Sequence, residues 1–185
     1  MDGQQYVGTD LWVFGYGSLI FRPDFPFVER REGFVRGWAR RFWQASPDHR
    51  GTRELPGRVV TLIEHAGARC WGVAYRVAAE HVALVLERLD ARECGGYQRR
   101  TLAFSAAAGD LEAVTVYVAD HRNPNYVGPE EEQRIAEIVR RAIGHSGANR
   151  EYVLHLAEAL AQAGEEDPHV LAIARALTES AVSAT

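Results

Sequence analysis

The chain has 185 residues, of which 46% are hydrophobic and 25% are charged, and its formal net charge is −4. This length fits one domain with a substantial hydrophobic core, and the negative charge gives no reason to expect a polyanionic partner. All 21 basic residues are arginines. The absence of lysine excludes Schiff-base catalysis and a phosphate-binding lysine of the Walker type.

The cysteines and the apolar segments bear on the compartment. Cys70 and Cys94 form no CxxC pair, so neither a disulfide framework nor a zinc site is expected, and a reducing compartment fits. No apolar run approaches the ~20 residues that span a bilayer. Residues 1–10 lack the basic and apolar segments of a secretory signal. We therefore expect a cytoplasmic protein without a membrane partner.

The first predicted elements are strands. We expect residues 1–10 to be flexible and residues 11–180 to form one domain. Residues 11–14 are a short apolar run that ends at Gly15, which is typical of a buried strand entering a tight turn. Residues 32–46 mix aromatic residues and arginines in partial alternation, which predicts an antiparallel strand with one solvated face.

The middle of the chain changes from strand to helix and back. Residues 58–64 and 70–77 predict a strand pair around a His-Ala-Gly turn. Residues 79–92 have apolar side chains at helical spacing. Residues 97–106 and 111–119 then predict two more strands.

The last third of the sequence is predicted to be helical. Pro129 is followed by three glutamates, a pattern that favours the start of a helix. Gly144 and Gly147 are expected to end this helix, and Asn149 to cap the next one over 150–163. Asp167 and Pro168 predict the start of a third helix. Because strands come first and helices last, the fold class is predicted to be α+β.

Several familiar site motifs fail in their context. Gly15-Tyr16-Gly17 starts like a dinucleotide-binding loop, but Ile20 stands at the third glycine position. The nucleophile motif Gly-x-Ser-x-Gly is absent. The seven histidines are scattered without a metal-binding spacing. We therefore expect neither a metal nor another cofactor.

Residues 34–43 interleave arginines with aromatic residues, and two interpretations of this stretch are open. Single-stranded nucleic acids bind to such surfaces. The alternative is a strand with its aromatic residues inward and its arginines outward. We favour the strand and expect no nucleic-acid partner, since the stretch is short and the net charge is negative.

Six short segments, in this order along the chain, resemble those of the ChaC-like γ-glutamylcyclotransferases. They are Phe-Gly-Tyr-Gly-Ser-Leu at 14–19, Arg-Gly at 50–51, Pro-Gly-Arg-Val-Val at 56–60, Arg-Glu at 92–93 before Gly-Gly-Tyr at 95–97, Asn-Tyr at 125–126 and Ser-Gly-Ala-Asn-Arg-Glu-Tyr at 146–152. The resemblance implies a small mixed β-barrel with flanking helices. It also implies a lyase-type activity that converts glutathione to 5-oxoproline and cysteinylglycine. We expect a monomer or a weak dimer.

The resemblance also implies the site residues. Glu93 matches the family's catalytic glutamate, and the γ-glutamyl group would be held by the loop of Tyr16, Gly17, Ser18 and Leu19. Arg50 and Tyr117 stand where the family has substrate-contacting side chains. Arg50 could instead be a plain surface arginine, and Tyr117 a core aromatic residue of a strand. Cys94 departs from the family's pattern, and an inert cysteine is favoured over a thiol nucleophile there, since no histidine is placed to activate it.

The implied reaction explains why these residue types are needed. The substrate's α-amine attacks its own side-chain amide carbonyl, so the nucleophile is already tethered and no enzyme nucleophile is required. Glu93 would take the amine's proton and pass one to the departing nitrogen. Backbone N–H groups of a glycine-flanked loop could stabilise the oxyanion or hold the α-carboxylate, for which Arg50 is another partner. Two alternatives stay open: cyclisation of other γ-glutamyl amines, and a binding module without activity.

Overall fold

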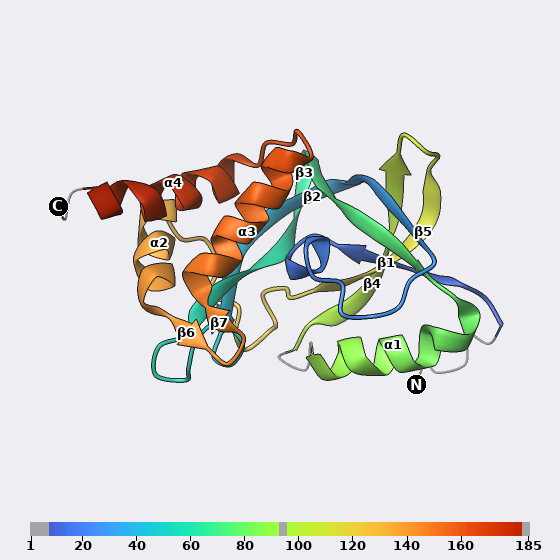
Figure 1. The fold of residues 1–185 in the computed structure, drawn as a ribbon, viewed down its shortest axis with the longest axis horizontal. Coiled ribbons are helices and arrows are strands. Elements are labelled where there is room, and N and C mark those ends of the chain that lie inside the picture. Colours follow the sequence, from blue (N-terminus) through green and yellow to red (C-terminus); the bar gives the residue numbers. More distant parts are fainter. Residues whose placement is uncertain (1–7, 93–95, 183–185) are drawn as a thin grey trace. The chain divides into compact units, whose positions relative to one another are not determined.

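The computed structural model describes residues 8–92 and 96–182 (Figure 1). The expected α+β class with a small β-barrel is confirmed. Within the described residues, five strands form a closed barrel in the order β1-β3-β2-β4-β5, and other segments form four α-helices. The chain divides into two compact units. The first unit comprises Met1–Ala39 and Glu64–Ala119, and the second comprises Arg40–Ile63 and Asp120–Thr185. The single domain over 11–180 remains a prediction.

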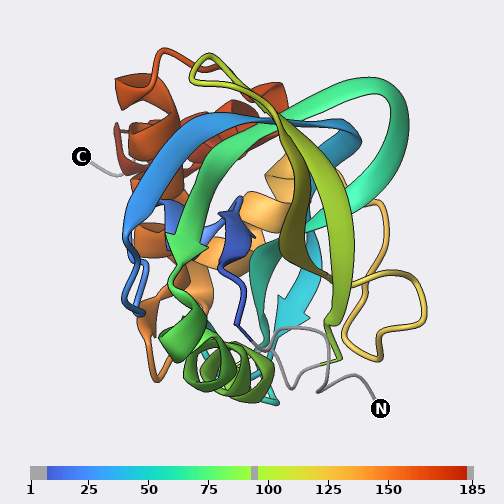
Figure 2. The same cartoon turned by 90° about the vertical axis from the view of Figure 1, so that its right-hand side faces the viewer.

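The first unit holds most of the barrel strands and one long helix. Its elements are β1 (Leu11–Gly15), the 3-10 helix η1 (Ser18–Ile20), α1 (Ala79–Arg92), β4 (Gln98–Ala106) and β5 (Leu111–Val118), with parts of β2 (Glu29–Ser46) and β3 (Gly57–Val77). In Figure 2 the strands of this unit curve strongly, and α1 lies at one end of them. The predictions for β1, α1, β4 and β5 agree with these bounds to within one residue.

β1 lies between two strands that come later in the chain. It pairs antiparallel with β3, where Phe14 faces Ala74, and parallel with β5, where Val13 faces Thr115. The apolar side chains of β1 pack in the core, and Val13 and Phe14 are almost completely buried. The segment that follows β1 therefore starts from a well-packed strand.

The predicted strand pair over 58–64 and 70–77 is wrong, because β3 is one continuous strand of 21 residues. The expected His-Ala-Gly turn is a bend within it, at which Gly67 has a φ of +80°. β2 contains a similar glycine, Gly37, with a φ of +79°. Glycine adopts this backbone conformation without steric cost, and such positions let a strand bend around a barrel.

The second unit contains the remaining helices. They are α2 (Glu132–Arg141), α3 (Asn149–Gln162) and α4 (Pro168–Val182), with a two-stranded sheet of β6 (Ile143–Gly144) and β7 (Gly147–Ala148). Asp167 accepts a hydrogen bond from the backbone N–H of Val170, which confirms the predicted start of α4. The helix expected at Pro129 begins at Glu132 instead.

Asn149 does not cap α3, contrary to the prediction, because it is the first residue of that helix. Its side-chain oxygen accepts a hydrogen bond from the backbone N–H of Arg58 at 2.6 Å, and its side-chain nitrogen donates to the carbonyl of Arg58 at 2.8 Å. Asn149 is completely buried, so the backbone of β3 replaces the solvent as its partner. The packing of α3 on β3 thus decides its role.

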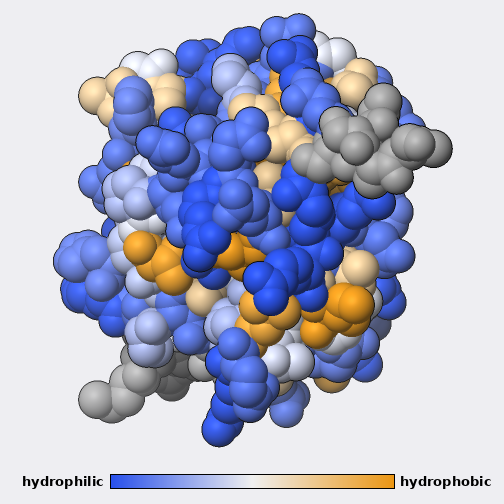
Figure 3. All heavy atoms as spheres, turned by 90° about the vertical axis from the view of Figure 1, so that its left-hand side faces the viewer, coloured by the Kyte–Doolittle hydropathy of each residue, from blue (hydrophilic) through white to orange (hydrophobic). Residues whose placement is uncertain are grey.

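The hydropathy of the surface and of the helices bears on where the protein can lie. On the face of the molecule shown in Figure 3, hydrophilic side chains predominate and the hydrophobic ones form small separate spots. Among the described residues, no helix has both the length and the apolar character that a membrane span requires.

Candidate active site

The loop after β1 folds back tightly on the end of that strand. A Cβ atom at Gly15 would lie 2.6 Å from the Cβ of Leu19, and a Cβ at Gly72 of β3 would lie 2.3 Å from the backbone oxygen of Gly15. Real Cβ atoms do not approach other atoms this closely, so both positions require glycine. The predicted loop of Tyr16, Gly17, Ser18 and Leu19 therefore has a compact backbone.

Two tyrosine hydroxyls form hydrogen bonds that hold this loop in place. Tyr16 is buried, and its hydroxyl donates to the backbone carbonyl of Tyr117 at 2.6 Å. Tyr75 of β3 donates to the carbonyl of Leu19 at 2.7 Å. Burial raises the pKa of Tyr75 to about 12. Its hydroxyl consequently remains a proton donor at physiological pH.

The last turn of α1 contacts both the loop and β5. Arg92 donates from Nη2 to the hydroxyl oxygen of Ser18 at 2.6 Å. The hydroxyl of Tyr117 donates to Oδ1 of Asp90, also at 2.6 Å. The structure thus brings the loop and Tyr117 together around the end of one helix. The chain reaches Glu93 one residue after Arg92.

Glu93 and Cys94 lie outside the described residues, so the role of Glu93 stays a prediction. Tyr117 is a buried residue of the strand β5, as the core interpretation expected, and its hydroxyl contacts Asp90. Its contact with a substrate remains a prediction. The sequence predicts no role for Tyr75 or Asp90, and Arg92 enters only within the family segment that contains Glu93. The only sequence signal for Asp90 is its position three residues before Glu93.

Arg50 belongs to the second unit and is not a surface arginine, since it is 9% exposed. Its Nη1 donates to the carbonyl of Ala148 at 3.2 Å, and its guanidinium lies over the ring of Tyr152 at 5.4 Å. Its backbone N–H donates to the hydroxyl of Ser46. Arg50 is thus held in a defined place within its own unit, and its contact with a substrate remains a prediction.

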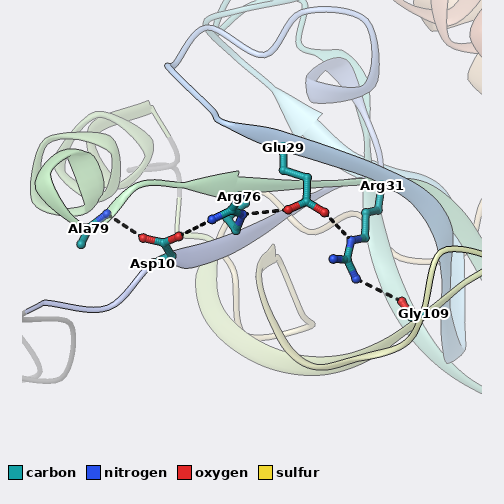
Figure 4. Close-up of polar contacts among 6 residues, drawn as sticks. All are labelled: Asp10, Glu29, Arg31, Arg76, Ala79 and Gly109. Carbon is teal, nitrogen blue, oxygen red and sulfur yellow. Dashed lines mark hydrogen bonds and ion pairs between the residues drawn. The ribbon is translucent and has the colours of Figure 1, made fainter.

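The other end of α1 is anchored by a chain of ionic contacts (Figure 4). Asp10 accepts a hydrogen bond from the backbone N–H of Ala79, at the start of the helix, and another from Arg76 at 2.7 Å. Arg76 also donates to Glu29 at 2.9 Å, and Glu29 accepts from Arg31 at 2.7 Å. Hydrogen bonds from the two arginines lower the pKa of Glu29. Both ends of α1 are therefore fixed to the barrel strands of the first unit.

The arginine-aromatic stretch at 34–43 forms part of β2, as favoured from the sequence. The expectation that its aromatic residues point inward and its arginines outward is only partly right. Phe42 is completely buried, but Arg40 is buried too and pairs with Asp167 at 3.2 Å. Phe34 is half-buried and lies under the guanidinium of Arg69, at 4.2 Å from the ring centre. That ring face is therefore in contact with a side chain of the protein itself.

No group of three or more histidine, cysteine, aspartate or glutamate side chains that could hold a metal ion occurs within residues 8–92 and 96–182.

Comparison with known proteins identifies the family. The family model of the ChaC-like proteins matches residues 11–180. The chain is 45% identical over 174 residues to human "Glutathione-specific gamma-glutamylcyclotransferase 1", covering 90% of this chain and 78% of the human protein. It is 37% identical over 179 residues to the "Glutathione-specific gamma-glutamylcyclotransferase" of Schizosaccharomyces pombe, covering 86% and 88% of the two chains.

A solved structure is similar over nearly the whole chain. It is the crystal structure of a selenomethionine-labelled γ-glutamyl cyclotransferase specific to glutathione, from yeast. The TM-score is 0.88 at 28% sequence identity, and the match covers 92% of this chain and 96% of the yeast chain. This chain belongs to the family of ChaC-like proteins.

Proposed function

We propose that this protein is a γ-glutamylcyclotransferase that acts on glutathione and releases 5-oxoproline and cysteinylglycine. The human and Schizosaccharomyces pombe relatives are named for this activity. One structural observation carries the proposal for the site: the hydrogen bond from Arg92 to Ser18 at 2.6 Å. Because Glu93 follows Arg92 directly in the sequence, this contact supports a site that combines the proposed catalytic group with the proposed substrate loop.

The proposed reaction is an intramolecular aminolysis. The nitrogen of the α-amine attacks the carbonyl carbon of the γ-amide, and a C–N bond forms to give a tetrahedral intermediate. The C–N bond to the cysteine nitrogen then breaks. Glu93 takes the proton that the attacking amine loses and delivers a proton to the leaving nitrogen, a contribution typically worth ~10²–10⁴-fold in rate.

The proposed role of the loop is to bind the γ-glutamyl group through its backbone and through Ser18. The oxyanion of the intermediate needs N–H donors at a fixed position, and removal of one such donor typically costs ~10²-fold or more in rate. The contacts of Gly15 with Leu19, and of Tyr75 with the Leu19 carbonyl, support this role because they hold the loop backbone in place. We further propose Tyr117 and Arg50 as substrate contacts.

The proposal is tested by incubating the purified protein with glutathione, without added metal or nucleotide, and measuring 5-oxoproline and cysteinylglycine. Equal amounts of the two products are expected. Absence of 5-oxoproline would contradict the proposal. A γ-glutamyl amino acid and γ-glutamyl-lysine serve as competing substrates, and preferential turnover of either would reassign the leaving group. A cytoplasmic location, a monomer or weak dimer and the absence of a nucleic-acid partner stay predictions.

A further inference from the structure

Two hydroxyl groups of the candidate active site contact the last turn of α1, and each hydrogen bond has a defined direction. Tyr117 is the donor in its bond to Asp90. Ser18 is the acceptor in its bond from Arg92. Both bonds are short, at 2.6 Å, and each has one charged partner. The helix thus imposes opposite directions on the two hydroxyls.

The chemistry of the helix side chains explains why these directions are fixed. An ionised carboxylate only accepts hydrogen bonds, and a guanidinium only donates them. A hydroxyl has one proton and two lone pairs. Tyr117 directs its proton to Asp90, so toward any further group it acts as an acceptor. Ser18 accepts from Arg92, so its own proton is available for an acceptor elsewhere.

The γ-glutamyl group carries one partner for each direction. Its α-ammonium can only donate hydrogen bonds, and its α-carboxylate can only accept them. We propose that Asp90 and Arg92 are positioning residues that set this polarity, so that Tyr117 accepts from the substrate's α-amino group and Ser18 donates to its α-carboxylate. This inference rests on the proposed function and deepens it, since it assigns the orientation of the substrate's amino-acid head.

The residues around the end of α1 support fixed hydrogen-bond directions for the two hydroxyls. Nε of Arg99 lies 3.5 Å from the same carboxylate oxygen of Asp90 that Tyr117 contacts, which restrains that carboxylate. Nη1 of Arg92 lies 3.9 Å from Asp24, so Asp24 is near the terminal nitrogen that does not contact Ser18. Tyr117 is only 7% exposed, so its ring has little freedom to turn.

The test uses three compounds that differ only in the amino-acid head. Glutathione has both charged groups, glutaryl-cysteinylglycine lacks the α-amine, and 4-aminobutanoyl-cysteinylglycine lacks the α-carboxylate. Their dissociation constants are measured by calorimetry in the Glu93→Gln background, so that turnover does not interfere. Steady-state kcat and KM for glutathione are measured in parallel with Glu93 intact.

Each variant is expected to weaken the binding of two compounds and spare the third. Asp90→Ala and Tyr117→Phe should weaken glutathione and the 4-aminobutanoyl compound by about tenfold, as for a lost hydrogen bond to a charged group, and leave the glutaryl compound unchanged. Ser18→Ala and Arg92→Met should weaken glutathione and the glutaryl compound and spare the 4-aminobutanoyl compound. Glu87→Gln, an exposed charge change on the same helix, is the control and should change none of the three.

Three results would overturn the inference. Equal weakening of all three compounds by a variant indicates a purely structural role for that residue. The reverse pattern indicates the opposite orientation, and binding of none of the three shows that the head group is not recognised here. The proposed function fails on a different result, namely absence of 5-oxoproline from glutathione with the unaltered protein, whatever the binding pattern.

Discussion

Tyr75 donates a hydrogen bond from its hydroxyl to the backbone carbonyl of Leu19, at 2.7 Å, and so connects the barrel strand β3 to the loop after β1. The same hydroxyl lies 3.4 Å from the carbonyl of Ile20. The ring packs against two phenylalanines, with its centre 5.7 Å from that of Phe25 and 4.9 Å from that of Phe27. Tyr75 is therefore placed to fix the loop backbone without itself belonging to the loop.

Tyr75→Phe is expected to keep the ring packing and to remove only the donor. The carbonyl of Leu19 would lose its side-chain partner, at a cost of about 1 kcal/mol in the free energy of unfolding. The kcat for glutathione is expected to decrease, with a smaller change in KM, because the loop would no longer be held in the position that stabilises the transition state. Urea unfolding and steady-state kinetics measure the two effects. Unchanged kcat would show that the loop is positioned by its other contacts.

Glu93→Gln is expected to remove nearly all turnover of glutathione while the protein stays folded. The amide cannot accept the amine's proton, so a loss of ~10²-fold or more is expected from the removal of general acid-base catalysis. Release of 5-oxoproline is the measurement, with the melting temperature as a check on folding. Glu87→Gln, with the same chemical change on the exposed side of α1, should be fully active. A fully active Glu93→Gln protein would contradict the assigned role.

His169 is expected to make the second unit sensitive to acid. It is buried, accepts from the backbone N–H of Phe42 at Nε2 and contacts Glu132 through Nδ1. Burial lowers the pKa of His169 below its ordinary value of 6.5, although Glu132 acts in the opposite direction. The neutral ring is thus favoured in the folded state. Its stabilising effect is complete above pH 6.5 and is lost as the pH falls toward and through the lowered pKa.

The change that tests this is His169→Gln, since glutamine can accept from Phe42 and donate to Glu132 without titrating. The free energy of unfolding is measured by urea denaturation between pH 7.5 and 5, a range chosen around the pKa of about 6.5 of an ordinary histidine. The free energy of unfolding of the variant should decrease less toward acid pH than that of the unaltered protein. His65→Gln, at an exposed histidine of β3, should retain the full decline. Identical pH profiles for all three proteins would assign the acid sensitivity to other groups.

Asp10 is expected to stabilise α1 through its first turn. Asp10→Ala removes the acceptor for the N–H of Ala79 and the partner of Arg76, and should lower the stability by about 1 kcal/mol, as for a lost helix cap. Asp10→Asn keeps an acceptor oxygen without the charge, and should therefore be less destabilised than the alanine variant. Urea unfolding at low and high salt separates the two contributions. If both variants are equally destabilised, the charge and not the cap is what matters.

The sequence by itself determined the local elements and the family motifs. Apolar spacing placed α1 at Ala79–Arg92, and the run ending at Gly15 placed β1 at Leu11–Gly15, because these patterns depend on neighbours along the chain. It also supplied the expectation for Glu93 through the segments shared with ChaC-like proteins. The expected hairpin within β3 was wrong, because a glycine with positive φ can produce either a turn or a bend in a continuous strand.

Only the tertiary structure decided which distant groups meet. Ser18 and Arg92 are 74 residues apart in the sequence, and Leu19 and Tyr75 are 56 apart, yet each pair is joined by a hydrogen bond. Asparagine is a good helix-capping residue, but the side chain of Asn149 forms its hydrogen bonds with the backbone of Arg58 instead. Hydrogen-bond partners follow from the packing of the barrel strands and helices, since a buried polar group binds the nearest complementary group in space. Propensities of single residues do not contain that information.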